Sequence, residues 1–153
     1  MSDRTKRLAL LSGVLLLAAA VRTAKAADPP AADADAIIGQ WQGTSLCTNR
    51  EVAPGCKDEK TRYTCTRAEG SGKIHMVADK LVNGEFVSMG DLDFDYVPAE
   101  RRWKSELKSA HAVWSFAVEG DRLSGTLVDA PTGAETRKVS AARQPERHGD
   151  QGH

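Results

Sequence analysis

Three cysteines, Cys47, Cys56 and Cys65, are the residues of this chain whose spacing most directly suggests chemistry. Thiols this close in sequence form disulfides, bind metals or act as nucleophiles, depending on their neighbours. We favour a Cys47–Cys56 disulfide, which would close the loop containing Pro54 and Gly55. Cys47–Cys65 is the alternative, because a hairpin centred near residue 56 would place these two positions almost opposite each other. Either pairing leaves one thiol, which we expect to be a small buried residue on a strand.

Metal binding is not favoured by the remaining candidate ligands. The chain has no Cys-x-x-Cys motif and no histidine close to the cysteines in sequence, so no zinc site is predicted. Asp91, Asp93 and Asp95 occupy alternate positions, so in a strand they share one face at a spacing of about 7 Å. A hard cation needs several oxygen atoms converging on one point. We therefore expect these carboxylates on a solvated outer face, with the intervening Leu92, Phe94 and Tyr96 pointing inward.

Nucleophilic catalysis would need a serine beside a base. The histidines that fall in the folded part of the chain are His75 and His111, and the serines considered as partners are Ser45, Ser88 and Ser115. No Gly-x-Ser-x-Gly elbow or comparable context surrounds any of these serines. The sequence therefore predicts a protein without enzymatic activity and without a cofactor.

The elements that would position these residues have a period of two. Between residues 38 and 143, turn residues recur every 8 to 14 positions and separate short alternating segments, which is typical of an all-antiparallel protein. The expected strands cover residues 40–48, 61–69, 73–82, 85–97, 101–109, 111–119, 122–130 and 135–143. Asn83-Gly84 is the strongest hairpin signal, because both residues tolerate a positive φ.

Eight sequential strands with short connections predict an up-and-down barrel, which leaves no sheet edge exposed. A sandwich of two β-sheets is the alternative. The alternation places a set of apolar residues inside the barrel: Trp41, Phe86, Leu92, Phe94, Tyr96, Trp114, Phe116 and Val118. From this set we select five residues as candidates for ligand binding, namely Phe86, Phe94, Tyr96, Trp114 and Phe116.

The two ends of the chain differ from the barrel segment in composition. Residues 1–26 have a basic start, an apolar run and a small-x-small triplet ending at Ala26, which is typical of a secretory signal peptide. The apolar run is shorter than the roughly 20 residues of a membrane span, so we expect export and not an integral membrane protein. Residues 27–36 are expected to form a flexible linker, 37–143 the barrel domain and 144–153 a disordered tail.

Charge excludes one class of partner. Five of the 21 basic residues and one of the 21 acidic residues lie in 1–26, so the mature chain has 16 basic and 20 acidic residues and a net charge of −4. Nucleic-acid binding depends largely on neutralising phosphates with basic side chains. We therefore expect no nucleic-acid partner.

Gly39-x-Trp41 on the first strand, with Arg137 or Arg143 near the last, resembles the pattern of the lipocalins and fatty-acid-binding proteins. In that family the tryptophan closes one end of an eight-stranded barrel and a late basic residue packs across its ring, a cation–π contact. The resemblance implies structural roles for Gly39, Trp41 and an arginine, for which we select Arg137. It also implies a binding protein for a small apolar ligand.

A second resemblance is to the small periplasmic protease inhibitors of Gram-negative bacteria, exported eight-stranded barrels with a Gly-x-Trp and one disulfide. Their N-terminal segment enters the protease cleft, and residues 27–36 would be the counterpart here. We expect a periplasmic or secreted protein that binds a small apolar ligand or an envelope component. The alternative is a protein–protein interaction module such as a protease inhibitor.

Overall fold

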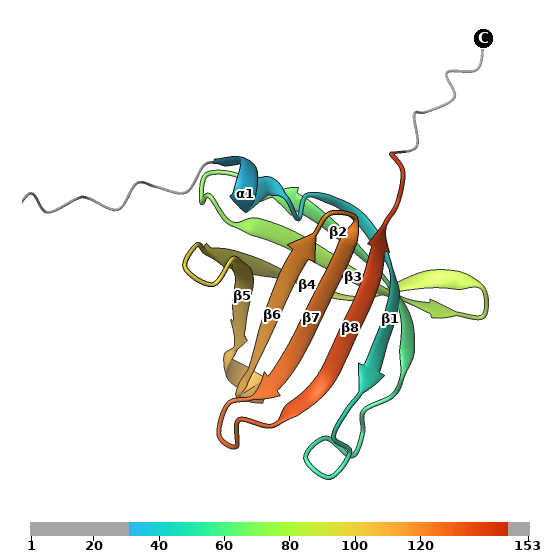
Figure 1. Cartoon of the computed structure of the whole chain (residues 1–153). Helices are drawn as coiled ribbons and strands as arrows, with labels where there is room; N and C mark the ends of the chain where they lie inside the picture. The colour runs from blue at the N-terminus through green and yellow to red at the C-terminus, as the bar shows by residue number, and fades with distance from the viewer. Residues whose placement is uncertain (1–30, 147–153) are drawn as a thin grey trace, which may run out of the picture.

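The computed structural model describes residues 31–146 and shows eight antiparallel strands closed into one barrel (Figure 1). The elements in chain order are α1 (Ala31–Asp35), β1 (Gly39–Cys47), β2 (Glu59–Arg67), β3 (Ile74–Val82), β4 (Glu85–Val97), β5 (Arg102–Leu107), the short 3-10 helix η1 (Lys108–Ala110), β6 (Ala112–Glu119), β7 (Arg122–Asp129) and β8 (Glu135–Arg143). The predicted up-and-down barrel is confirmed, and the sandwich alternative is wrong.

Closure depends on pairing between the first and last strands. β1 pairs with β8 from Trp41 opposite Arg143 to Cys47 opposite Arg137, and every other strand pairs with its neighbours in sequence. At the predicted hairpin, Asn83 and Gly84 both have positive φ, at 51° and 87°. These values suit a tight turn whose twist matches that of the strands it joins.

β4 departs from regular pairing in two ways. Its register with β3 shifts between Ala78 and Asp79, which lie opposite Gly90 and Ser88, so Met89 is an extra residue in a β-bulge. β4 also pairs with β5 only from Asp95 to Val97. Between β4 and β5 the barrel is therefore closed only by the short run of paired residues at the C-terminal end of β4.

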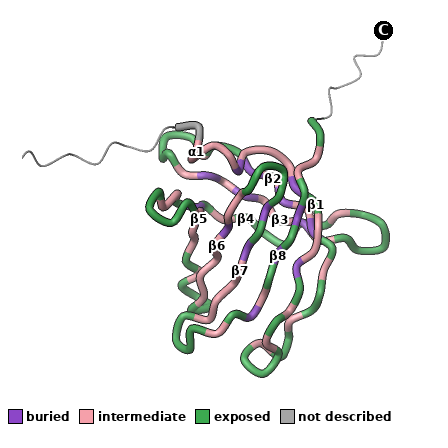
Figure 2. The backbone as a smooth tube through the Cα atoms, viewed as in Figure 1, coloured by how far each residue is buried: buried purple, intermediate pink, exposed green. Residues whose placement is uncertain are grey.

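Large side chains close the end of the barrel beside α1, which we call the closed end. Ile37, Trp41 and Trp103 are almost completely buried there. The two indole N–H groups donate to backbone carbonyls, Trp41 to Ile37 at 2.8 Å and Trp103 to Ala34 at 3.0 Å. Figure 2 shows buried segments along the strands and exposed segments at the hairpins. The structural role expected for Trp41 thus has a direct geometric basis.

The segment expected to be a flexible linker includes the short helix α1 and makes contacts with the barrel. Asp35 forms an ion pair with Arg67, and Arg143 donates to the Ala36 carbonyl at 2.7 Å. These contacts, which sequence pattern does not reveal, fix the segment over the closed end. The expected signal peptide, the first residues of the expected linker and residues 147–153 of the expected tail lie outside the described part of the chain.

No helix within residues 31–146 is long and apolar enough to cross a membrane.

Candidate functional site

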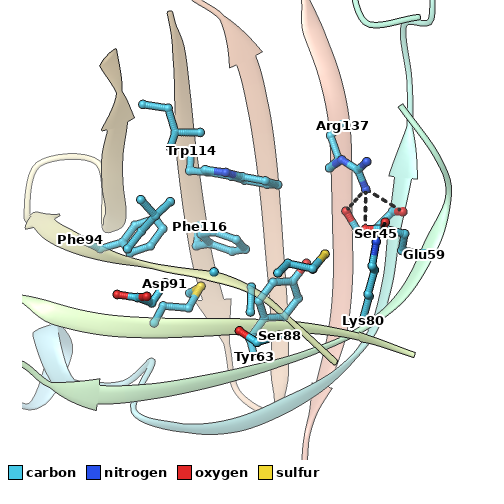
Figure 3. Close-up of a pocket in the computed structure, with 16 residues that line it drawn as sticks. Ser45, Glu59, Tyr63, Lys80, Ser88, Asp91, Phe94, Trp114, Phe116 and Arg137 are labelled. Atoms are coloured by element: carbon cyan, nitrogen blue, oxygen red, sulfur yellow. Dashed lines mark hydrogen bonds and ion pairs between the residues drawn. The ribbon is translucent and has the colours of Figure 1, made fainter. Parts of the chain in front are cut away.

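A cavity of about 690 Å³ lies inside the barrel, at the end opposite the closed end (Figure 3). Its walls come from β1, β2, β3, β4, β6 and β8, and from Leu107 at the end of β5. Residues far apart in sequence therefore meet there. One side is aromatic and the other is polar. The two sides are described in turn below.

Phe116 on β6 is the centre of the aromatic side. Its ring stacks on Trp114 with centroids 5.4 Å apart and meets the edges of Phe94 at 5.5 Å and Tyr63 at 5.7 Å. Phe94 and Phe116 are 1% exposed, whereas Trp114 is half-buried. Trp114 is therefore the ring of this cluster with most surface left for a bound molecule.

Space for the Phe116 ring comes from the opposite strand. Gly125 on β7 pairs directly with Phe116, and a Cβ at this position would lie 2.4 Å from Cε1 of the ring. Aromatic side chains pack over glycine in this way because a strand without a side chain leaves room for a ring. The position of Phe116 thus depends on Gly125.

Four residues make up the polar side, and Figure 3 shows them facing one another: Ser45, Glu59, Lys80 and Arg137. Arg137 Nη1 donates to Ser45 Oγ at 2.8 Å and lies 3.6 Å from Glu59 Oε2. Lys80 Nζ lies 3.6 Å from Glu59 Oε1. Two cations share one carboxylate, so these four residues carry one excess positive charge; Asp91, at the β4 border, is the other acidic residue of the lining.

The two cations differ in how many of their hydrogen-bond donors have partners within the protein. Arg137 Nη2 also donates to the Lys57 carbonyl at 3.0 Å and lies 3.1 Å from Cys56 Sγ. Within the described residues, Glu59 is the ion-pair partner found for Lys80. An ammonium group has three donors. Lys80 therefore keeps donors available for another acceptor.

Tyr63 links the two sides of the cavity. Burial raises the pKa of its phenol, while the neighbouring hydroxyls of Thr61 and Ser45 and the charge of Arg137 act in the opposite direction. The phenol stays neutral at physiological pH, so it can both donate and accept a hydrogen bond.

The favoured disulfide is confirmed, and the alternative pairing is wrong. Cys47 and Cys56 are bonded, and Cys65 is a buried free thiol. Cys47 lies directly opposite Arg137 on β8, so the bridge lies beside this cavity residue. The disulfide therefore packs against Arg137 from behind the lining, in addition to bracing the loop.

The expected pairing of Arg137 with Trp41 is wrong. Arg143 lies over the Trp41 ring, with its guanidinium carbon 4.1 Å from the ring centroid. Gly39, the other expected structural residue, has φ of 124° and would place a Cβ 3.0 Å from Arg143 Nη1. The register of β1 with β8 decides which arginine contacts Trp41, because Arg143 lies opposite Trp41. Arg137 lies on the same face of β8 but six residues away, opposite Cys47.

Three of the five expected ligand-binding residues line the cavity: Phe94, Trp114 and Phe116. Tyr96 is partly buried in the interior but packs on Trp103 at the closed end, 4.9 Å between centroids. Phe86 was expected to point into the barrel, and this prediction is wrong. The bulge at Met89 reverses the inward and outward positions that precede it. Phe86 instead lies on the outer face, with Arg62 4.4 Å above its ring.

Ionisable residues on the outer face form surface ion pairs. His75 Nδ1 lies 2.8 Å from Asp93 Oδ1, and Lys73 Nζ lies 2.6 Å from Asp95 Oδ2. In the described residues, no contact joins His75 or His111 to the serines considered as nucleophiles, and no cluster of metal-ligating side chains occurs. Asp93 and Asp95 lie on the outer face, as the alternation predicts, whereas Asp91, although it lies 3.7 Å from His75 on that face, also lines the border of the cavity.

Sequence reasoning missed Glu59 and Lys80 as cavity residues and assigned Arg137 to the wrong contact. Alternation contained a usable signal for Glu59, because it shares the face of Tyr63 on β2. The second strand was expected to begin at residue 61, so Glu59 was not considered as an inward-facing residue. Only the register brings Ser45, Glu59 and Arg137 together.

Comparison of the sequence with protein-family models found no match, and comparison with curated proteins found none.

Proposed function

We propose that this protein is an exported, non-catalytic binding protein for a small amphipathic molecule that has an apolar ring system and an acidic group. The observation that carries this proposal is the cavity of about 690 Å³ with Trp114 and Phe116 on one side and Lys80 and Arg137 on the other. Small-molecule sites of roughly 300–1,000 Å³ with mainly apolar walls and a few convergent polar groups are common.

The aromatic side supports a ligand with a flat apolar part. Trp114 is stacked on Phe116 and keeps part of its surface exposed, so a ring can extend the stack toward the cavity. Aromatic pairs in offset or edge arrangements are worth about 0.5–1.5 kcal/mol beyond the area they bury. The aromatic side of the cavity thus favours ligands with rings over ligands with flexible chains.

The polar side supports an acid as the second part of the ligand. The side chains of Arg137 and Glu59 are 15% and 18% exposed, so their charges are only partly solvated. A partly buried excess positive charge costs free energy until an anion neutralises it. The free donors of Lys80 and the phenol of Tyr63 lie on the same wall and would hold a carboxylate or sulfonate.

Export is proposed from the ends of the chain and the disulfide together. Residues 1–26 have the composition of a signal peptide, and the Cys47–Cys56 bridge is of a kind that persists in oxidising compartments. The protease-inhibitor alternative would require an N-terminal segment free to enter a cleft. The carbonyls of Ala34 and Ala36 instead hold Trp103 and Arg143, so these residues have a structural role.

The first experiment measures binding of 8-anilinonaphthalene-1-sulfonate, which combines two ring systems with an acid. We expect its fluorescence to rise on binding and Trp114→Ala to weaken the affinity about tenfold, by loss of the stack. Phe86→Ala is the matched control, because that ring lies on the outer face. If both variants bind as the parent does, the cavity is not the binding site.

The second experiment tests the acidic group. Lys80→Gln should weaken binding of the sulfonate about two- to fivefold, and Glu59→Gln should strengthen it by a similar factor, because partly exposed charges are worth about 0.5–1 kcal/mol. N-phenyl-1-naphthylamine, which has the rings without the sulfonate, should bind both variants alike. Equal effects on the charged and uncharged probes would contradict the preference for an acid.

A further inference from the structure

One edge of β4 has no partner along most of its length. β4 pairs with β3 from Glu85 to Phe94, but β5 meets it only from Asp95 to Val97. Within the part of the chain that the structure describes, no other strand pairs with this second edge. Backbone N–H and C=O groups of alternate residues therefore point away from the sheet, and such an edge is a template for another extended segment.

The free edge borders the cavity. Five consecutive residues of β4, 88–92, line the cavity, and Leu107 at the end of β5 lines it as well. In Figure 3, Ser88 and Asp91 lie on the strand that passes along this border. A strand added to β4 would therefore have one face toward the cavity and one toward solvent.

Side chains along the edge define what an added strand must carry. On the outer face, Asp91 and Asp93 are 64% and 51% exposed. His75 lies 3.7 Å and 2.8 Å from these carboxylates, and Glu106 is exposed on β5. On the inner face, Leu92 is apolar and Gly90 has no side chain. Opposite charges on directly facing residues stabilise strand pairs.

We infer that the free edge of β4 binds an extended peptide segment of another protein in which basic and apolar residues alternate. The basic side chains face Asp91 and Asp93, and the apolar side chains lie over Gly90 and Leu92 at the cavity border. Backbone hydrogen bonds supply affinity, and the alternate side chains supply specificity. This proposal does not rest on the proposed ligand, although the two sites adjoin at residues 88–92.

A second copy of this chain fits the edge less well. Antiparallel pairing of two β4 edges around Leu92 would place Asp91 of one chain opposite Asp93 of the other. Like charges that face each other directly destabilise a strand pair. The acidic face thus selects against self-pairing and in favour of a basic partner.

The test uses a blocked heptapeptide in which lysine and valine alternate, titrated into the ¹⁵N-labelled mature protein. We expect the largest amide shifts in residues 85–94, together with slower hydrogen exchange of alternate amides there. Asp91→Lys should weaken binding about three- to tenfold, since attraction becomes repulsion at one cross-strand pair. Glu69→Lys, which makes the same charge change at an exposed turn residue, should bind as the parent does.

A second peptide with the same side chains separates strand pairing from simple charge attraction. Methylation of alternate backbone nitrogens on one edge removes its hydrogen-bond donors, and we expect binding to be lost. The proposal is overturned if the methylated peptide binds equally well, if neither peptide shifts residues 85–94, or if sedimentation shows that the free protein is a dimer and its alternate amides in residues 85–94 are already protected from exchange.

Discussion

Arg143 lies across the ring of Trp41 and ties three parts of the chain together. Its guanidinium carbon is 4.1 Å from the ring centroid, and its two terminal nitrogens donate to the carbonyls of Ile38 at 2.8 Å and Ala36 at 2.7 Å. The first strand, the last strand and the segment that leads into the barrel therefore meet at one side chain. Closure of this end depends on a planar group with several donors.

Replacing Arg143 by alanine should lower the free energy of unfolding by about 2–3 kcal/mol, because one cation–π contact and two hydrogen bonds are lost. Arg143→Lys should recover only part of this loss, since an ammonium cannot lie flat on the ring and reach both carbonyls. Chemical denaturation monitored by tryptophan fluorescence measures both. Arg122→Ala, at an exposed position, is the control. Unchanged unfolding of Arg143→Ala would show that the contact contributes nothing.

Strand number, order and approximate boundaries could be predicted from the sequence, because alternation and turn residues are local signals. The identity of the arginine on Trp41 could not, since Arg137 and Arg143 occupy the same face of β8 and differ only in register. Register depends on pairing between residues about a hundred positions apart. The cavity wall of Ser45, Glu59 and Arg137 was missed for the same reason.

Phe86 shows a second limit of pattern analysis. Its spacing from Phe94 predicts the same face, yet one extra residue at Met89 moves it to the outside. A β-bulge changes every inward and outward assignment on one side of it. Gly90, with φ of 139°, lies next to the bulge and is the one local sign of irregularity in this strand.

Gly125→Ala should destabilise the barrel by roughly 1–3 kcal/mol, because the new methyl group would overlap the Phe116 ring and force it to move. Gly55→Ala is the matched control, since nothing lies within 4 Å of a Cβ there. Thermal unfolding of both variants measures the difference. Adding Phe116→Leu to Gly125→Ala should restore part of the loss, whereas equal stability of the two single variants would contradict the packing described.

Cys65 should resist alkylation in the folded protein. Burial raises the pKa of its thiol to about 12, with Arg143 opposing the shift. The thiolate is the reactive form. At pH 8 we expect iodoacetamide to modify no cysteine in the native chain, one in concentrated guanidinium chloride and three when a reductant is added. Intact mass counts the labels, and labelling of the native protein would show that this thiol is accessible.

Protonation of Asp58 at acidic pH should weaken the hydrogen bond that its carboxylate accepts from Cys47 at the start of the disulfide loop. Its carboxylate accepts the backbone N–H of Cys47 at 2.8 Å and a bond from Arg50 at 3.2 Å, and the Cys47 bond is the main reason why its pKa lies below the ordinary value. A lowered folded-state pKa means that the contact stabilises the fold above the unfolded-state pKa. That contribution is lost as the pH falls through the folded-state value.

NMR titration measures this coupling directly. The Asp58 carboxyl carbon and the Cys47 amide proton should shift together, at a pH below the roughly 4 of an ordinary aspartate. Asp58→Asn keeps an oxygen acceptor for the Cys47 N–H but cannot titrate, so in that variant the amide shift should stay flat over the same range. A carboxyl that titrates at the ordinary value, or a Cys47 amide that moves equally in the asparagine variant, would show that this bond does not control the loop. Because Cys56 Sγ lies 3.1 Å from Nη2 of the cavity residue Arg137, the same titration repeated with 8-anilinonaphthalene-1-sulfonate bound would reveal whether the loop and the cavity respond together.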